Sequence, residues 1–282
     1  MALNEDNQNS PEAGEKFRPV MFLARPFTFT GETVMGWINI LGAATVFLVK
    51  ALWVSLRPRQ FSKVVKQVYY IGARSMTIIM LVSLFTGMVL GLQSYHALVQ
   101  FGAQGAVGSL VSLSLIMELG PVLTAIMITA RAGSAITAEI GIQRISEQID
   151  ALHTMQINPL QYLVSPKITA AIISFPLLTA MFDLIGIFGG YISGVALLGL
   201  NAGVYVHSIQ AYVVMSDINN GFIKSIVFAV IVSTVCCYQG YFAHMRKDSH
   251  GAQAVGLATT SAVVLSCVLI LVSDYVVTSL LI

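Results

Sequence analysis

Five ionisable side chains lie within or beside long apolar runs, where a charge could serve transport or catalysis. They are Glu118, Arg131, Asp183, Lys224 and Asp274. Each would cost roughly 2.5–3.5 kcal/mol at the centre of a bilayer unless it is paired or hydrated, so we expect all five to face protein or water. Arg131 is expected to be structural, near a helix end. On composition alone, Glu118 fits a buried structural carboxylate better than a ligand contact, and the other three fit structural groups whose interhelical pairing the sequence does not assign.

Other chemistry is poorly supported by the residue types and their spacing. The five histidines show no metal-ligand spacing, and the three cysteines lie in apolar runs, so we predict no metal site and no disulfide framework. A G-x-x-x-x-G-K-[ST] phosphate loop is absent from the sequence, so the chain is not expected to hold ATP in a site of that kind. We therefore predict a chain that is not an enzyme and has no cofactor of its own.

The composition places these charges in a membrane protein. Of 282 residues, 56% are hydrophobic and only 10% are charged, against roughly 25% charged in ordinary soluble domains. The stretch from Ser75 to Met117 contains no Asp, Glu, Lys or Arg, although one helical crossing needs only about 20 apolar residues. These values exclude a soluble globular enzyme. The net charge of +2 is too small to indicate a nucleic-acid partner.

Apolar runs predict an all-α membrane protein with five transmembrane helices. Residues 1–16 are polar and are expected to form a disordered cytoplasmic tail. Residues 17–66 form a separate N-terminal region, in which 33–49 is at the lower limit for a crossing, and 67–282 contain the long apolar runs. The five expected crossings are about 69–96, 105–131, 167–198, 218–243 and 252–281.

The basic residues predict the orientation. They gather before the first crossing and in the second and fourth connections, whereas the first and third connections, 97–104 and 199–216, contain no Lys or Arg. By the positive-inside rule the N-terminus is cytoplasmic and the C-terminus periplasmic. The segment 33–49 is then an in-plane or re-entrant helix on the cytoplasmic side, because a crossing there would place one basic group outside.

Glycines at helical spacing predict close helix packing. Gly87 and Gly91 lie in the first crossing, and Gly186, Gly190 and Gly194 in the third. Small residues four apart let helix backbones approach closely in lipid. Packing within the chain is favoured over a dimer contact, and both remain open.

The second connection predicts an amphipathic helix over residues 139–152. Its apolar positions recur at i, i+3, i+7 and i+10, and charged residues occupy the rest. The segment is too polar to span, so it should lie along the cytoplasmic surface. It is either a simple connector or a docking helix for a cytoplasmic partner.

The run from Glu118 to Lys167 resembles the MlaE/YrbE permease family. It carries in order ELGP, ARAGSA, AEIG, SEQIDAL and NPLQYLVSP, and family-like segments GMVLGLQSY, PLLT, GIFGGY and IKSIVF flank it, so the resemblance covers about 60–280. Two positions depart from the family pattern. Ala130 stands in place of a glycine, and Ile145-Ser146 stands where the family often has Val/Ala-Thr.

This resemblance implies an inner-membrane homodimer that moves phospholipid to or from a periplasmic hexamer of the MCE type. Each subunit would have an N-terminal membrane elbow region over 17–66 and a permease domain of the family's type over 67–282. ATP and Mg²⁺ would be bound by a separate cytoplasmic ABC ATPase, together with a STAS-type accessory subunit. The resemblance places a phospholipid site at Leu90, Gln93, Tyr95, Leu98, Phe101 and Glu118. It places the ATPase-coupling residues at Glu139, Arg144, Glu147, Gln148, Asp150, Ala151 and Leu152.

Two other classes remain open at this point. An ATP-independent secondary transporter or lipid scramblase would use Glu118, Asp183 and Asp274 as ion-coupling groups. A membrane scaffold that transports nothing would carry no lipid when purified.

Overall fold

A computed structural model describes residues 42, 45–51, 53, 61–245 and 251–281 of the chain. The predicted tail over 1–16 lies outside these residues, as does most of the predicted elbow segment 33–49. The helices described below all belong to one unit, Val46–Ile282.

Five helical segments are long and apolar enough to cross a membrane, which confirms the predicted all-α architecture. The first two segments extend beyond the expected crossings, at the N-terminal side of the first and the C-terminal side of the second. Their bounds are Phe61–Val99, Gln104–Ile145, Leu160–Leu197, Met215–Tyr241 and Ala252–Leu281.

Short helices and turns subdivide the first three segments. The α-helices are α2 (Phe61–Val68), α3 (Arg74–Val99), α4 (Val107–Ser114), α5 (Gly120–Ile128), α6 (Ser134–Ile145), α7 (Gln148–Thr154), α8 (Ser165–Tyr191), α9 (Ala202–Tyr212), α10 (Met215–Tyr241) and α11 (Ala252–Leu281). Two π-helical turns interrupt the second segment, Leu115–Leu119 before α5 and Thr129–Gly133 after it. These turns hold Glu118 and Arg131. A π-helical turn rotates the side chains that follow it relative to a continuous α-helix, and such turns are frequent at functional sites.

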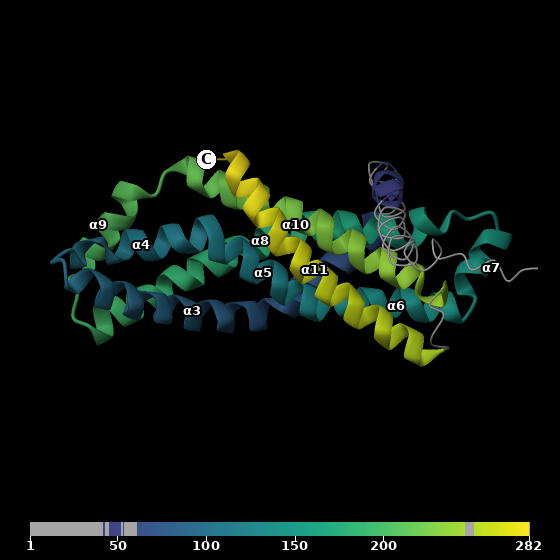
Figure 1. The fold of residues 1–282 in the computed structure, drawn as a ribbon, viewed down its shortest axis with the longest axis horizontal. Helices are drawn as coiled ribbons and strands as arrows, with labels where there is room; N and C mark the ends of the chain where they lie inside the picture. The colour runs from purple at the N-terminus through teal and green to yellow at the C-terminus, as the bar shows by residue number, and fades with distance from the viewer. Residues whose placement is uncertain (1–41, 43–44, 52, 54–60, 246–250, 282) are drawn as a thin grey trace, which may run out of the picture. The chain divides into compact units, whose positions relative to one another are not determined.

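Helices α3 and α8 run side by side and pack through glycines (Figure 1). A Cβ atom at Gly87 would overlap the carbonyl oxygen of Gly186, and one at Gly189 would overlap that of Leu84. Ser83 adds a hydrogen bond from its hydroxyl to the carbonyl oxygen of Phe182. The glycine strips of the first and third crossings therefore serve packing within the chain, as predicted.

The connections gather at the two ends of the bundle. Helix α9 lies at the same end as the α3–α4 connection, and α7 lies at the opposite end near the start of α11 (Figure 1). Helix α9 was not predicted within the connection 199–216. It is capped by Asn201, whose side-chain oxygen accepts a hydrogen bond from the backbone N–H of Gly203 at 2.8 Å.

The predicted continuous helix over 139–152 is wrong. Helix α6 ends at Ile145, and α7 begins at Gln148 after a turn in which Glu147 has a left-handed backbone with φ of 58°. The break changes which apolar side chains are covered, since Ile149 is fully buried whereas Ile142 is 57% exposed. The apolar spacing therefore continued across a turn and did not mark one helical face.

Candidate functional site

A buried lysine joins three of the spanning segments. The Nζ atom of Lys224 on α10 lies 2.8 Å from Oε2 of Glu118 and 3.1 Å from Oδ1 of Asp274 on α11. It also donates a hydrogen bond to the carbonyl oxygen of Met117 at 2.8 Å. The Lys224 side chain is only 3% exposed, so its charge is compensated by these partners and not by water. This Lys224 cluster supplies the interhelical pairing that the sequence left unassigned.

The Lys224 cluster joins two carboxyl groups to one ammonium group. The Glu118 side chain is 44% exposed, although Thr278 on α11 donates a hydrogen bond to its Oε1 atom at 3.3 Å. A half-exposed carboxylate held on both oxygens is fixed in position but still open on one side. Such a group can accept hydrogen bonds from a hydrated or donor-bearing ligand.

The other predicted lipid-site residues lie at the end of α3 and just beyond it. Leu90, Tyr95 and Leu98 pack partly against the core, while Gln93 is exposed and Phe101 is 82% exposed. The ionic and hydrogen-bonding partners of Glu118 lie on α10 and α11, not on this part of α3. Within one chain the predicted site is therefore divided into an apolar part and a charged part.

Ion pairs fix the segment predicted to couple to an ATPase. Nζ of Lys167, at the start of α8, lies 2.5 Å from Oε2 of Glu139 on α6. Nη1 of Arg144 on α6 lies 2.6 Å from Oδ1 of Asp150 on α7, so this pair closes the turn between the two helices. The angle between α6 and α7 is thus held by a contact that joins residues on both sides of the break.

His244 supports the same turn from the α10–α11 connection. Nε of Arg144 donates a hydrogen bond to Nδ1 of His244 at 3.1 Å, and the guanidinium also lies over the ring of Tyr241. Partial burial, followed by the nearby Arg144 charge, lowers the pKa of His244 below its usual value of 6.5. A neutral imidazole can accept the hydrogen bond that an imidazolium cannot.

The outer surface of α7 is open. Glu147, Gln148, Asp150 and Ala151 are exposed, and Leu152 is partly buried. Since Arg144 and Glu139 are committed to ion pairs, the polar side-chain surface available to a partner is mainly that of Glu147 and Gln148.

Arg131 fits the structural role expected for it. Its Nη1 atom donates hydrogen bonds of 2.8 Å both to the carbonyl oxygen of Tyr70 and to Oγ of Ser75. The guanidinium also lies over the Tyr70 ring. These contacts tie the second spanning segment to the start of α3.

The sequence of this all-helical protein is similar to those of known permeases. The family described as Permease MlaE matches residues 64–280, which is most of the chain. The chain belongs to the MlaE permease family. The permease is 42% identical over 251 residues to a probable ABC transporter permease protein of Rickettsia bellii, covering 89% of this chain and 95% of the relative.

Two further relatives bear on function. The permease is 40% identical over 253 residues to the intermembrane phospholipid transport system permease protein MlaE of Haemophilus influenzae, again covering 89% of this chain and 95% of the relative. It is 33% identical over 208 residues to the chloroplastic protein TRIGALACTOSYLDIACYLGLYCEROL 1 of Arabidopsis thaliana, covering 74% of this chain and 58% of that protein.

Sequence reasoning missed two features of the permease. One is the contact of His244 with Arg144, which joins positions a hundred residues apart, so no local sequence signal exists for it. Asp183 was grouped with the structural carboxylates, but it makes no hydrogen bond or ion pair within the part of the chain that the structure describes.

Proposed function

We propose that this permease is the membrane-spanning subunit of an ATP-driven phospholipid transporter in the inner membrane. The observation that carries the proposal is the 40% identity, over almost the whole length, to a Haemophilus permease named for intermembrane phospholipid transport. In this proposal the chain performs no covalent chemistry. It works as a homodimer and exchanges lipid with a periplasmic hexamer of the MCE type.

A separate cytoplasmic ABC ATPase, with a STAS-type accessory subunit, would bind ATP and Mg²⁺ and dock on α7. Two features support this docking surface. Its polar face is exposed, the Arg144–Asp150 pair fixes it to α6, and the Lys167–Glu139 pair in turn fixes α6 to α8. A rigid attachment lets a rigid-body movement of the ATPase pass into the membrane helices.

The phospholipid would lie between the end of α3 and the Lys224 cluster. Leu90, Leu98 and Phe101 offer an apolar wall for acyl chains, with Gln93 and Tyr95 beside them, and the open side of Glu118 offers a polar contact near the headgroup. The division of these groups within one chain favours a cavity that a second copy completes.

The test is reconstitution. The permease is purified from cells in mild detergent, and bound proteins and lipids are identified by mass spectrometry. Co-purification of an ABC ATPase with phospholipid, and lipid transfer in proteoliposomes that requires ATP hydrolysis, is the expected result. Transfer that proceeds equally without the ATPase and nucleotide would favour a scramblase, and a purified permease that carries no lipid would favour a scaffold.

A further inference from the structure

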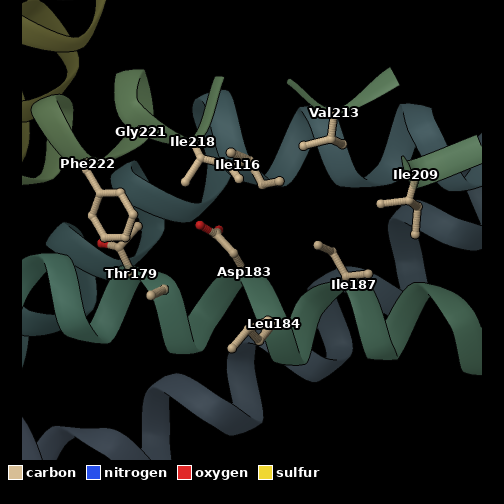
Figure 2. Close-up of a pocket in the computed structure, with 11 residues that line it drawn as sticks. Ile116, Thr179, Asp183, Leu184, Ile187, Ile209, Val213, Ile218, Gly221 and Phe222 are labelled. Atoms are coloured by element: carbon tan, nitrogen blue, oxygen red, sulfur yellow. The ribbon is translucent and has the colours of Figure 1, made fainter. Parts of the chain in front are cut away.

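A cavity lies between α8, α9 and α10, beside the π-helical turn Leu115–Leu119 (Figure 2). Its volume is about 340 Å³, at the lower end of the range of small-ligand pockets, roughly 300–1,000 Å³. Leu184, which is 66% exposed, and the partly exposed Phe222 mark its opening to the bilayer. Its lining consists of Ile116, Thr179, Ala180, Asp183, Leu184, Ile187, Ile209, Val213, Ile218, Gly221 and Phe222.

Two polar atoms in this cavity have no partner. Oδ1 of Asp183 and Oγ1 of Thr179 are buried and make no hydrogen bond within the described residues. The two residues are four apart on α8 and therefore lie on the same face, and Figure 2 shows the Asp183 carboxylate pointing into the space between α8 and α10. Buried polar atoms in folded proteins are almost always hydrogen-bonded, so two unpartnered atoms in one cavity indicate a site where a ligand can bind.

The fold keeps room for the carboxylate. A Cβ atom on Gly120, the glycine of the ELGP run, would overlap Oδ1 of Asp183. On the opposite wall, a Cβ atom on Gly221 would press on the carbonyl oxygen of Ile116. Any larger residue at these two positions would push α5 or α10 away and change the cavity around Asp183.

The lining selects the charge of the occupant. It contains no Lys, Arg or His, so nothing in it would compensate a phosphate, and a phospholipid headgroup is a poor fit. A carboxylate and a hydroxyl in an otherwise apolar cavity complement an ammonium group on an alkyl chain. We propose that this cavity binds a primary alkylamine, with its ammonium at the Asp183 carboxylate and its chain against the apolar side chains of the lining.

This proposal does not depend on the proposed transport function, because the cavity shares no residue with the Lys224 cluster, the end of α3 or α7. The experiment measures binding of dodecylamine and dodecanoate, which have the same chain and opposite charges, to the purified full-length permease in a non-ionic detergent. We expect dodecylamine to bind at least about tenfold more tightly than dodecanoate. Asp183→Asn should reduce that preference to under about twofold, and Thr179→Val should weaken amine binding while keeping the preference.

Asp217→Asn on α10 is the matched control, since it removes a carboxylate that lies outside the cavity lining and keeps a side-chain oxygen that can accept the hydrogen bond from the N–H of Val214. It should leave the preference for dodecylamine unchanged. Ala180→Phe should fill the cavity and reduce binding of both probes. Should Asp183→Asn fail to fold, a photoreactive alkylamine on the wild-type chain should label peptides of α8 and α10, and Ala180→Phe should abolish that labelling. Equal loss in Asp183→Asn and Asp217→Asn, or labelling spread evenly over all five segments, would overturn the proposal.

Discussion

Lys224 is buried between two carboxylates that belong to different helices, and this arrangement has an energetic consequence. Removing one partner of a buried ion pair typically costs 3–5 kcal/mol, because the remaining charge is left uncompensated. We expect Lys224→Met to destabilise the permease by about that amount, measured as thermal unfolding in detergent. The triple variant Lys224→Met, Glu118→Gln and Asp274→Asn should recover much of the loss. Equal stability of Lys224→Met and wild type would mean that water, not these carboxylates, compensates the lysine.

His244 should make the α6–α7 turn sensitive to pH. Because its pKa is lowered in the folded state, its contribution to stability is present above the unfolded pKa of about 6.5 and is lost as the pH falls through the lower folded value. Protonation also removes the acceptor for the Arg144 N–H. The protection factor for hydrogen exchange over 143–153, which removes the intrinsic pH dependence of exchange, should therefore fall as the pH drops below about 6.5, and His244→Gln should make it less dependent on pH. An unchanged pH profile in His244→Gln would assign the effect to other groups.

At the scale of single residues, the sequence predicts which charged side chains need partners but not which residues those partners are. The cost of a charge in an apolar run identifies Glu118, Asp183, Lys224 and Asp274 as groups that need partners. It does not say that Lys224 takes two of them and Asp183 none, because the pairing depends on how each helix is rotated about its axis. Glu118 and Lys224 are more than a hundred positions apart in the sequence, and their contact exists only in the assembled bundle.

At the scale of helices, the approach of α3 to α8 requires glycine. Gly87→Ala should destabilise the permease by about 1–3 kcal/mol, because the added methyl group would meet the backbone of Gly186. Gly256→Ala on α11 is the matched control, since a Cβ atom there meets nothing within 4 Å. The control should be neutral or slightly stabilising, given the higher helix propensity of alanine. Similar losses in both variants would show that helix packing is not the cause.

The exposed surface of α7 offers a second test at this scale. Glu147→Arg reverses a charge without breaking the Arg144–Asp150 pair, and a like charge placed against a basic partner surface can cost several kcal/mol. ATPase association, measured by co-purification, should fall about tenfold or more while membrane insertion persists. Gln104→Arg, an exposed position at the opposite end of the bundle, should have no effect. Normal association and transport in Glu147→Arg would leave α7 as a connector only.

The sequence predicts the long helices better than the short ones. Hydropathy predicted all five spanning segments because each is far longer and more apolar than a soluble helix. The short helix α9 and the break before α7 were not predicted. A left-handed Glu147 has no sequence signature of the kind that glycine would give, and the apolar spacing on either side of it remained in phase with one helix.

For the whole molecule, the orientation of the bundle is a prediction that thiol labelling can test. A cysteine at Tyr212, exposed at the end of α9, should react with a membrane-impermeant reagent added to cells with a permeabilised outer membrane, whereas one at Ser146 should not. The native Cys236 and Cys237 are buried, so Cys267→Ala provides a background with little reactivity. Labelling at Ser146 instead of Tyr212 would reverse the orientation.

The length of the second spanning segment has a mechanical consequence. Gln104–Ile145 contains 42 residues, which at 1.5 Å per residue gives about 60 Å of helix, twice the roughly 30 Å of a hydrocarbon core. About 40 Å of it separates the π-helical turn at Glu118 from the tip that carries α7. A segment that bends at this turn, where its hydrogen-bonding pattern changes, would act as a lever. A tilt of about 5° at that pivot would swing the tip by 3–4 Å, so a small displacement beside the Lys224 cluster and a large one at α7 would be the same movement.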